Sequence, residues 1–119
     1  MRIQQMGEIP GGVILSIDGD LYGGPHADEF YALIRDLIMR GKKLVLVDLT
    51  RARRANSSGL GILVRGYALL KDAGGALRVF NLSDGVDHMF KITRFNSIIE
   101  VYENEAEARA GRDGTAPSS

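Results

Sequence analysis

The feature that most constrains the fold is an almost unbroken aliphatic run over residues 43–49, Lys-Leu-Val-Leu-Val-Asp-Leu. A strand with one face in water alternates apolar and polar residues, whereas this run offers aliphatic side chains to both faces. Such strands are typical of parallel sheets that are covered by helices. We therefore predict that this strand lies centrally in its sheet.

Strand and helix patterns alternate along the rest of the chain. Phe30, Ile34 and Leu37 recur at the three- and four-residue spacing of one helical face, and Gly41 ends that helix. The predicted strands are residues 2–6, 13–18, 43–49, 76–81 and 98–102. The predicted helices begin near residues 25, 57, 84 and 105. This alternation predicts a mixed α/β fold with a mostly parallel sheet of four to five strands, about four helices and an N-terminal antiparallel hairpin.

The helix starts carry recognisable capping residues. Pro25 suits the first turn of the first helix, because its missing N–H has no intrahelical acceptor there. Ser83 is predicted to cap the third helix. Asn104, with Glu107 three residues later, forms a capping-box pattern at the start of the last helix.

Length and composition limit the classes of protein to consider. We expect 119 residues to form one domain over residues 1–110, with a disordered tail over residues 111–119. The 15 Lys and Arg residues balance 15 Asp and Glu residues, which disfavours nucleic acid and membrane surfaces as partners. With no Cys, two His and no signal peptide, we expect a cytoplasmic protein without a metal ion or cofactor.

The segment with the most unusual chemistry is Asn-Ser-Ser-Gly-Leu-Gly at residues 56–61, where the central strand gives way to the second helix. One capping residue explains only part of this pattern, because each glycine within a helix costs about 1 kcal/mol relative to alanine. The small residues indicate either close packing of the helix on a strand or the approach of a partner to the backbone. A phosphate on a serine here would be stabilised by the free N–H groups and the dipole of the helix.

At these residues the sequence resembles the STAS domain, the fold of sulphate-transporter C-terminal regions and bacterial anti-sigma factor antagonists. The resemblance runs from about Val13 to Ala108. It includes the turn at residues 19–21, the strand at 44–49, the motif at 56–61, the turn at 74–75 and the segment 81–83.

The resemblance implies a phosphorylation switch at Ser57, with Ser58 as the second choice. In antagonists of this family, an anti-sigma factor that is also a serine kinase phosphorylates the matching serine, and a phosphatase resets it. The protein would then be a substrate and a ligand, not an enzyme. Asp48 would support the site structurally. The residues expected to contact the partner are Asp20, Tyr22, Gly23, Arg53, Arg54, Asn56, Ser58, Gly59, Leu60 and Gly61.

Two family positions have changed, and the charge near Ser57 has changed with them. Asn56 replaces the Asp of the family motif, and Tyr22 replaces the Asp that usually follows the Gly-x-Leu turn. Arg51, Arg53 and Arg54 add positive charge. These arginines are either a solvated loop, a surface for an acidic partner, or groups that pair with phosphoserine.

Two further hypotheses use the same residues. A STAS scaffold or regulatory subunit, for example with a lipid-transport ATPase or in a stress-signalling assembly, would bind its partner without phosphorylation. A serine hydrolase would use Ser57, His26 and Asp48, although the Gly-x-Ser-x-Gly motif of such enzymes is absent. The hairpin at the sheet edge could also pair with a second copy of the chain, which would form a weak homodimer.

Overall fold

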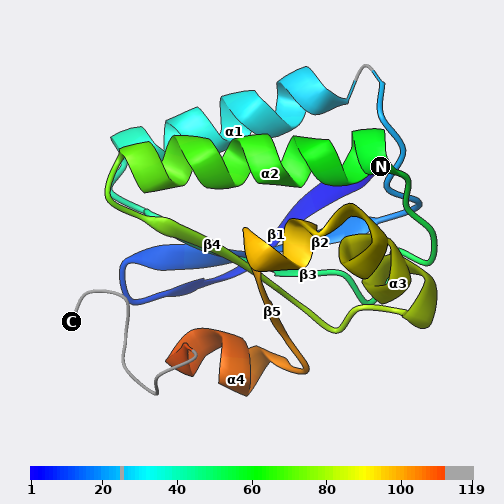
Figure 1. Ribbon diagram of the computed structural model, residues 1–119. Coiled ribbons are helices and arrows are strands. Elements are labelled where there is room, and N and C mark those ends of the chain that lie inside the picture. Colours follow the sequence, from blue (N-terminus) through cyan, green and yellow to red (C-terminus); the bar gives the residue numbers. More distant parts are fainter. Residues whose placement is uncertain (25, 112–119) are drawn as a thin grey trace.

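The computed structural model describes residues 1–24 and 26–111, which form one five-stranded sheet with helices on both faces (Figure 1). The strands are β1 (Arg2–Ile9), β2 (Gly12–Asp18), β3 (Leu44–Asp48), β4 (Ala76–Phe80) and β5 (Glu100–Tyr102). The helices are α1 (Ala27–Met39), α2 (Ser57–Asp72), α3 (Asp84–Thr93), a 3₁₀ turn η1 (Phe95–Ser97) and α4 (Glu105–Ala110). The predicted mixed α/β class is confirmed.

The sheet order follows the chain, β1-β2-β3-β4-β5, with β3 in the middle. β1 and β2 form an antiparallel hairpin, and every later pairing is parallel. The central position predicted for residues 43–49 is therefore correct. Because β2 to β5 are parallel, the loops that follow them, including the one that leads into α2, all leave from the same edge of the sheet.

The two faces of the sheet are covered unequally. α1, α2 and α3 pack on one face, where the main core includes Leu15, Val47, Phe30 and Leu63. α4 lies on the opposite face with a smaller cluster that includes Leu46 and Phe80. The aliphatic residues of β3 are needed on both sides, as its unbroken pattern predicts.

Arg78 of β4 lies on the face covered by α4 and is itself buried. Its Nη1 donates to the carbonyl of Ala108 at 2.8 Å, near the C-terminal end of α4. Its Nε lies 3.4 Å from a carboxylate oxygen of Glu100 on β5. A buried cation is tolerated only when it is paired or hydrogen-bonded, so Arg78 fastens α4 to the sheet.

The predicted caps on the two short helices are present. The Ser83 hydroxyl accepts from the Val86 N–H at 3.2 Å at the start of α3. The Asn104 side chain accepts from the Glu107 N–H at 2.9 Å at the start of α4. The prediction for Pro25 lies outside the described residues.

The predicted tail can be followed only at its first residue. The Gly111 N–H donates to the carbonyl of Glu107 at 3.0 Å, so this residue ends α4. Residues 112–119 lie outside the described part of the chain. No helix among the described residues is both long enough and apolar enough to traverse a bilayer.

Candidate partner-binding site

The loops before α1 and before α2 run side by side at the carboxyl edge of the sheet. Leu21 and Ala55 form a parallel bridge, and the Leu21 carbonyl accepts from the N–H of Asn56 at 3.1 Å. The Leu21 N–H donates to the Arg54 carbonyl at 2.8 Å. These bonds extend the sheet pairing into the loops and fix the chain immediately before Ser57.

Ser57 is the first residue of α2 and is exposed. Asn56 is the N-cap, and its side-chain oxygen accepts from the Gly59 N–H at 2.8 Å. Because an aspartate would cap this amide equally well, the Asn in place of the family's Asp costs the helix no cap. Ser58 is also exposed. Both candidate hydroxyls are therefore accessible from outside the molecule.

The three glycines predicted at the site, Gly23, Gly59 and Gly61, differ in how much space a side chain would have. A Cβ on Gly59 would lie 1.8 Å from the Leu21 carbonyl oxygen, so this position requires glycine for close packing. A Cβ on Gly23 would lie 2.7 Å from Ser58 Cβ. A Cβ on Gly61 would meet nothing within 4 Å. Close packing therefore explains Gly59, whereas it does not explain Gly61.

Leu60 was expected to contact a partner, and the structure corrects that expectation. Its side chain is 0% exposed and belongs to the main core. Gly59 is buried as well. The apolar spacing of α2 places residue 60 on the face toward the sheet, so Leu60 holds the start of the helix in position from below.

Asp20 and Tyr22 lie on the loop that runs beside the start of α2. The Asp20 carboxylate accepts from the Arg54 N–H at 3.1 Å, so this side chain fastens one loop to the other. Tyr22 is 47% exposed, which leaves much of its ring available on the surface next to Gly23 and Ser58.

Asp48 lies at the carboxyl end of β3, at the edge of the sheet from which the loops leave. Its carboxylate accepts from the Thr50 N–H at 3.0 Å and from the Asn81 side chain at 3.5 Å, which ties the ends of β3 and β4 together. His26 lies 3.9 Å from Glu29. Among the described residues, no hydrogen bond links Ser57 to His26 or Asp48. The proposed hydrolase triad is therefore not assembled.

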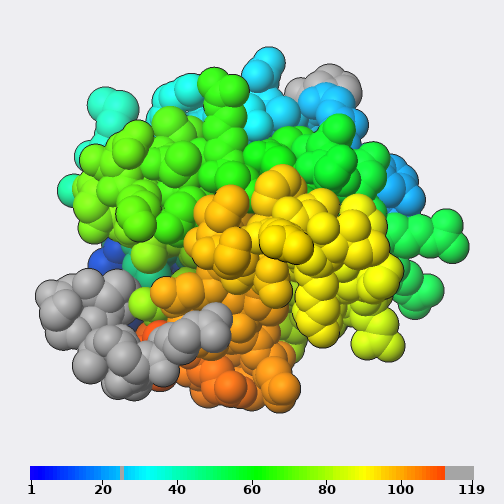
Figure 2. Space-filling model, viewed as in Figure 1, coloured from blue at the N-terminus to red at the C-terminus, as the bar shows by residue number. Residues whose placement is uncertain are grey.

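The arginines of the loop before α2 project from the edge of the sheet. In Figure 2 the green segment that follows β3 stands out at the right-hand side of the molecule, beyond α3. Arg51 lies 4.0 Å from Asp18. Arg53 and Arg54 are exposed, and neither guanidinium lies within ion-pair distance of a carboxylate in the described part of the chain. This surface carries positive charge that the fold does not neutralise.

The start of α3 contacts the loop that carries Arg51, Arg53 and Arg54, which we call the arginine loop. The sequence patterns did not reveal this contact. The Ser83 hydroxyl, besides capping α3, donates to the Arg53 carbonyl at 2.9 Å. A Cβ on Gly85 would lie 2.8 Å from the same carbonyl oxygen. Residues 30 or more positions apart therefore fit together here, which local spacing cannot predict.

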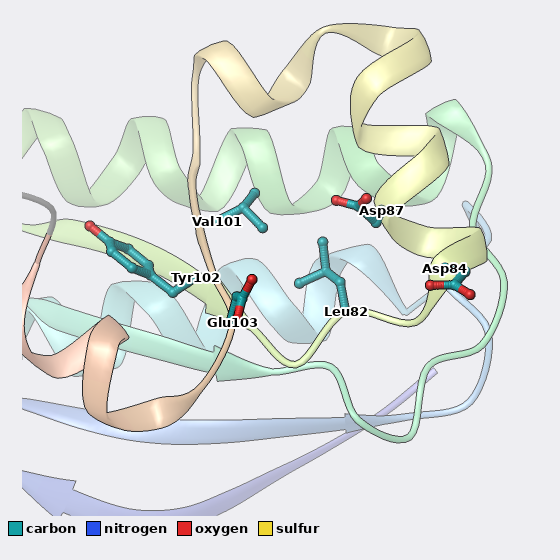
Figure 3. Close-up of a pocket in the computed structure, with 6 residues that line it drawn as sticks. All are labelled: Leu82, Asp84, Asp87, Val101, Tyr102 and Glu103. Atoms are coloured by element: carbon teal, nitrogen blue, oxygen red, sulfur yellow. The ribbon is translucent and has the colours of Figure 1, made fainter.

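A pocket of about 410 Å³ lies farther along the same edge (Figure 3). It is lined by Leu82, Asp84, Asp87, Val101, Tyr102 and Glu103. None of these was predicted as a site residue, and none belongs to the start of α2. Among residues 1–24 and 26–111, no three His, Asp or Glu side chains are grouped so that they could hold a metal ion.

Comparison of the sequence with models of known protein families identifies the family of this chain. A model of the STAS domain matches residues 3–108. The chain belongs to the STAS domain family. It is 32% identical over 91 residues to the anti-sigma-B factor antagonist of Listeria monocytogenes, a match that covers 74% of this chain and 75% of that protein.

Two solved structures show that the fold is shared with other bacterial proteins. An anti-sigma factor antagonist from Mycobacterium paratuberculosis superimposes with a TM-score of 0.72 at 17% identity, covering 90% of this chain and 91% of that one. The Bacillus cell fate determinant SpoIIAA in its phosphorylated form superimposes with a TM-score of 0.65 at 18% identity, covering 88% and 95%. The family resemblance and the fold expected from it are confirmed.

Proposed function

We propose that the protein is an anti-sigma factor antagonist that is switched by phosphate on Ser57. The unmodified chain would bind an anti-sigma factor with serine kinase activity, phosphorylation would release that partner, and a phosphatase would restore binding. Relatives named as anti-sigma-B factor antagonists support the function class. The observation that carries the choice of residue is the exposed Ser57 at the first position of α2.

The start of α2 is suited to accept an anion. The Asn56 side chain satisfies the N–H of Gly59, and no acceptor is recorded for the N–H groups of Ser57 and Ser58 among the described residues. The first turn of α2 contains no acidic residue. Free N–H groups and the positive end of the dipole stabilise a nearby negative charge by about 0.3–1 kcal/mol.

The same phosphate would weaken docking. Phosphoserine carries about −1.5 to −2 charges at neutral pH, together with a shell of bound water. Ser57 directly follows the loop that carries Arg53 and Arg54, and it precedes Ser58, which lies against Gly23 of the neighbouring loop, so a partner that covers this face must meet the new charge. A sigma factor regulator acts in the cytoplasm, and we propose that location for this protein.

Intact-mass analysis tests the assignment. The purified chain is incubated with ATP and, one at a time, with the purified anti-sigma factor kinases encoded in the same genome. One kinase is expected to add one phosphate to the parent chain and to Ser58→Ala, and none to Ser57→Ala. A phosphate that persists in Ser57→Ala and is lost in Ser58→Ala would move the site to Ser58.

The second candidate is a STAS scaffold that binds without phosphorylation. Asn56 and Tyr22, which stand where the family has acidic residues, favour it. If none of these kinases adds phosphate to the chain, while one of them forms a stable complex with it on size-exclusion chromatography in the presence of ATP, the result would support the scaffold and contradict the switch.

A further inference from the structure

We propose that Arg53 and Arg54 recognise an acidic patch on the protein that docks over Ser57. This inference rests on the proposed function, because it assumes that the start of α2 is the docking face. It goes further by stating the charge of the partner's contact surface. Three structural observations support it, and they concern the pairing of the charges, the rigidity of the loop and the distance to Ser57.

The first observation is that the two charges lack internal partners. Elsewhere on the surface, Arg40, Lys91 and Arg109 each lie within 3.0 Å of a carboxylate on their own helix. Arg53 and Arg54 are adjacent and exposed, and no carboxylate of the described residues lies within 4 Å of either guanidinium. An acidic partner would therefore meet two charges that are not already neutralised.

The second observation is that the backbone beneath these side chains is fixed. The Arg53 carbonyl accepts from the Ser83 hydroxyl at 2.9 Å. The Arg54 N–H donates to Asp20 at 3.1 Å, and its carbonyl accepts from the Leu21 N–H at 2.8 Å. A loop that is ordered before binding loses less conformational entropy in the complex.

The third observation is the distance to the modified residue. Ser57 follows Arg54 by three residues, so their Cα atoms lie at most about 11 Å apart even in a fully extended chain. This upper limit is somewhat longer than the Debye length of about 8 Å at physiological salt, so charges at these two positions are partly screened from each other. A phosphate with about −1.5 to −2 charges would offset part of this positive charge and thereby weaken the attraction for an acidic surface.

The alternative role for the arginines is to hold the phosphate itself. Extended backbone at Asn56 and the pairing of Ala55 with Leu21 separate Arg54 from Ser57 along the chain. Direct pairing between an arginine and phosphoserine would make the phosphorylated form resist a phosphatase, which is measurable and is one outcome of the test.

The first arm of the test requires no identified partner. The ¹⁵N-labelled chain is titrated with an octaglutamate peptide and followed by NMR at low and high salt. The Arg53 and Arg54 side-chain signals are expected to shift in the parent at low salt and to shift less at high salt. Shifts centred elsewhere, or equal binding by Arg53→Glu/Arg54→Glu, would overturn the proposal.

The second arm uses the kinase that phosphorylates the chain. Arg53→Glu/Arg54→Glu is expected to slow association with it on the order of 10-fold, with a reduced salt dependence. The control Arg35→Glu/Lys43→Glu makes the same change in net charge at two exposed residues outside the loops at the start of α2, and it should bind like the parent. Because all the recorded bonds of Arg53 and Arg54 use backbone atoms, both variants should fold.

The outcomes separate this inference from the proposed function. Phosphorylation of Ser57 with unchanged association of the Arg53→Glu/Arg54→Glu variant would overturn the acidic partner and leave the switch intact. Salt-sensitive docking that requires the arginines, without phosphate transfer, would overturn the switch and support the acidic partner. Faster phosphatase release from Arg53→Ala/Arg54→Ala, with unchanged association, would assign the arginines to the phosphate instead.

Discussion

The starts of α2 and α3 lie at the same edge of the sheet and are built alike, yet they differ in charge. Each has a polar N-cap whose side-chain oxygen accepts a hydrogen bond from the N–H three residues later. Asn56 accepts from Gly59, and Ser83 accepts from Val86. The first turn of α3 contains Asp84 and Asp87, whereas that of α2 contains no acidic residue and two exposed serines.

The difference indicates which helix start is left open for a negative charge. In α3, carboxylates already compensate the positive end of the dipole. α1 and α4 also have acidic residues in the first turn, so among the described α-helices only α2 lacks them. An added phosphate would give α2 the compensation that the other helices obtain from their own sequence.

The largest expected effect comes from the glycine that holds the start of α2 against the neighbouring loop. Gly59→Ala would force a Cβ against the Leu21 carbonyl oxygen, and we expect it to lower the free energy of unfolding by about 1–3 kcal/mol. Gly61→Ala is the matched control, because its Cβ meets open space and alanine favours a helix by about 1 kcal/mol. Urea unfolding of both variants measures this, and equal losses would contradict the packing explanation.

Removing either helix cap should lower the free energy of unfolding by less than Gly59→Ala does. Asn56→Ala removes one cap and is expected to cost about 1 kcal/mol. Ser83→Ala removes the α3 cap and also leaves the Arg53 carbonyl without its hydroxyl donor, so we expect a larger loss. Thermal unfolding at one pH compares the two. A smaller cost at Ser83 would mean that its bond to the arginine loop contributes little.

The smallest expected effect comes from exchanging the charges of the two helix starts. Ser57→Asp places a carboxylate in the first turn of α2 and should stabilise the protein by about 0.3–1 kcal/mol at low salt. Asp84→Asn should lose a similar amount at the start of α3. Denaturant unfolding at low and high salt tests both, because a dipole effect must shrink as salt is added. Destabilisation by Ser57→Asp would show that α2 does not favour an anion.

The sequence alone was enough to predict the strands and helices and the exposure of Ser57. The aliphatic run of β3, the helical spacing around Ile34 and the caps at Ser83 and Asn104 are local patterns, and each produced the expected structure. The exposure of Ser57 follows from its place at the first position of a helix that starts at the sheet edge.

The contacts between loops could not be predicted in the same way. Asp20 accepts from Arg54, and Ser83 donates to Arg53, across 34 and 30 positions of sequence. Such pairs depend on how separate loops meet at the sheet edge, which no periodicity records. Leu60 was misassigned for a related reason, because a motif shared with a binding site includes residues that only support it.

The buried Arg78 has a consequence for anyone who shortens this protein. Its guanidinium is held by the carbonyls of Ala108 and Arg109, at the very end of the last helix. Deleting residues 105–111 would strand a cation in the interior and uncover Leu46 and Phe80 at once, which favours aggregation. A shortened chain should therefore keep every residue of α4 and Gly111.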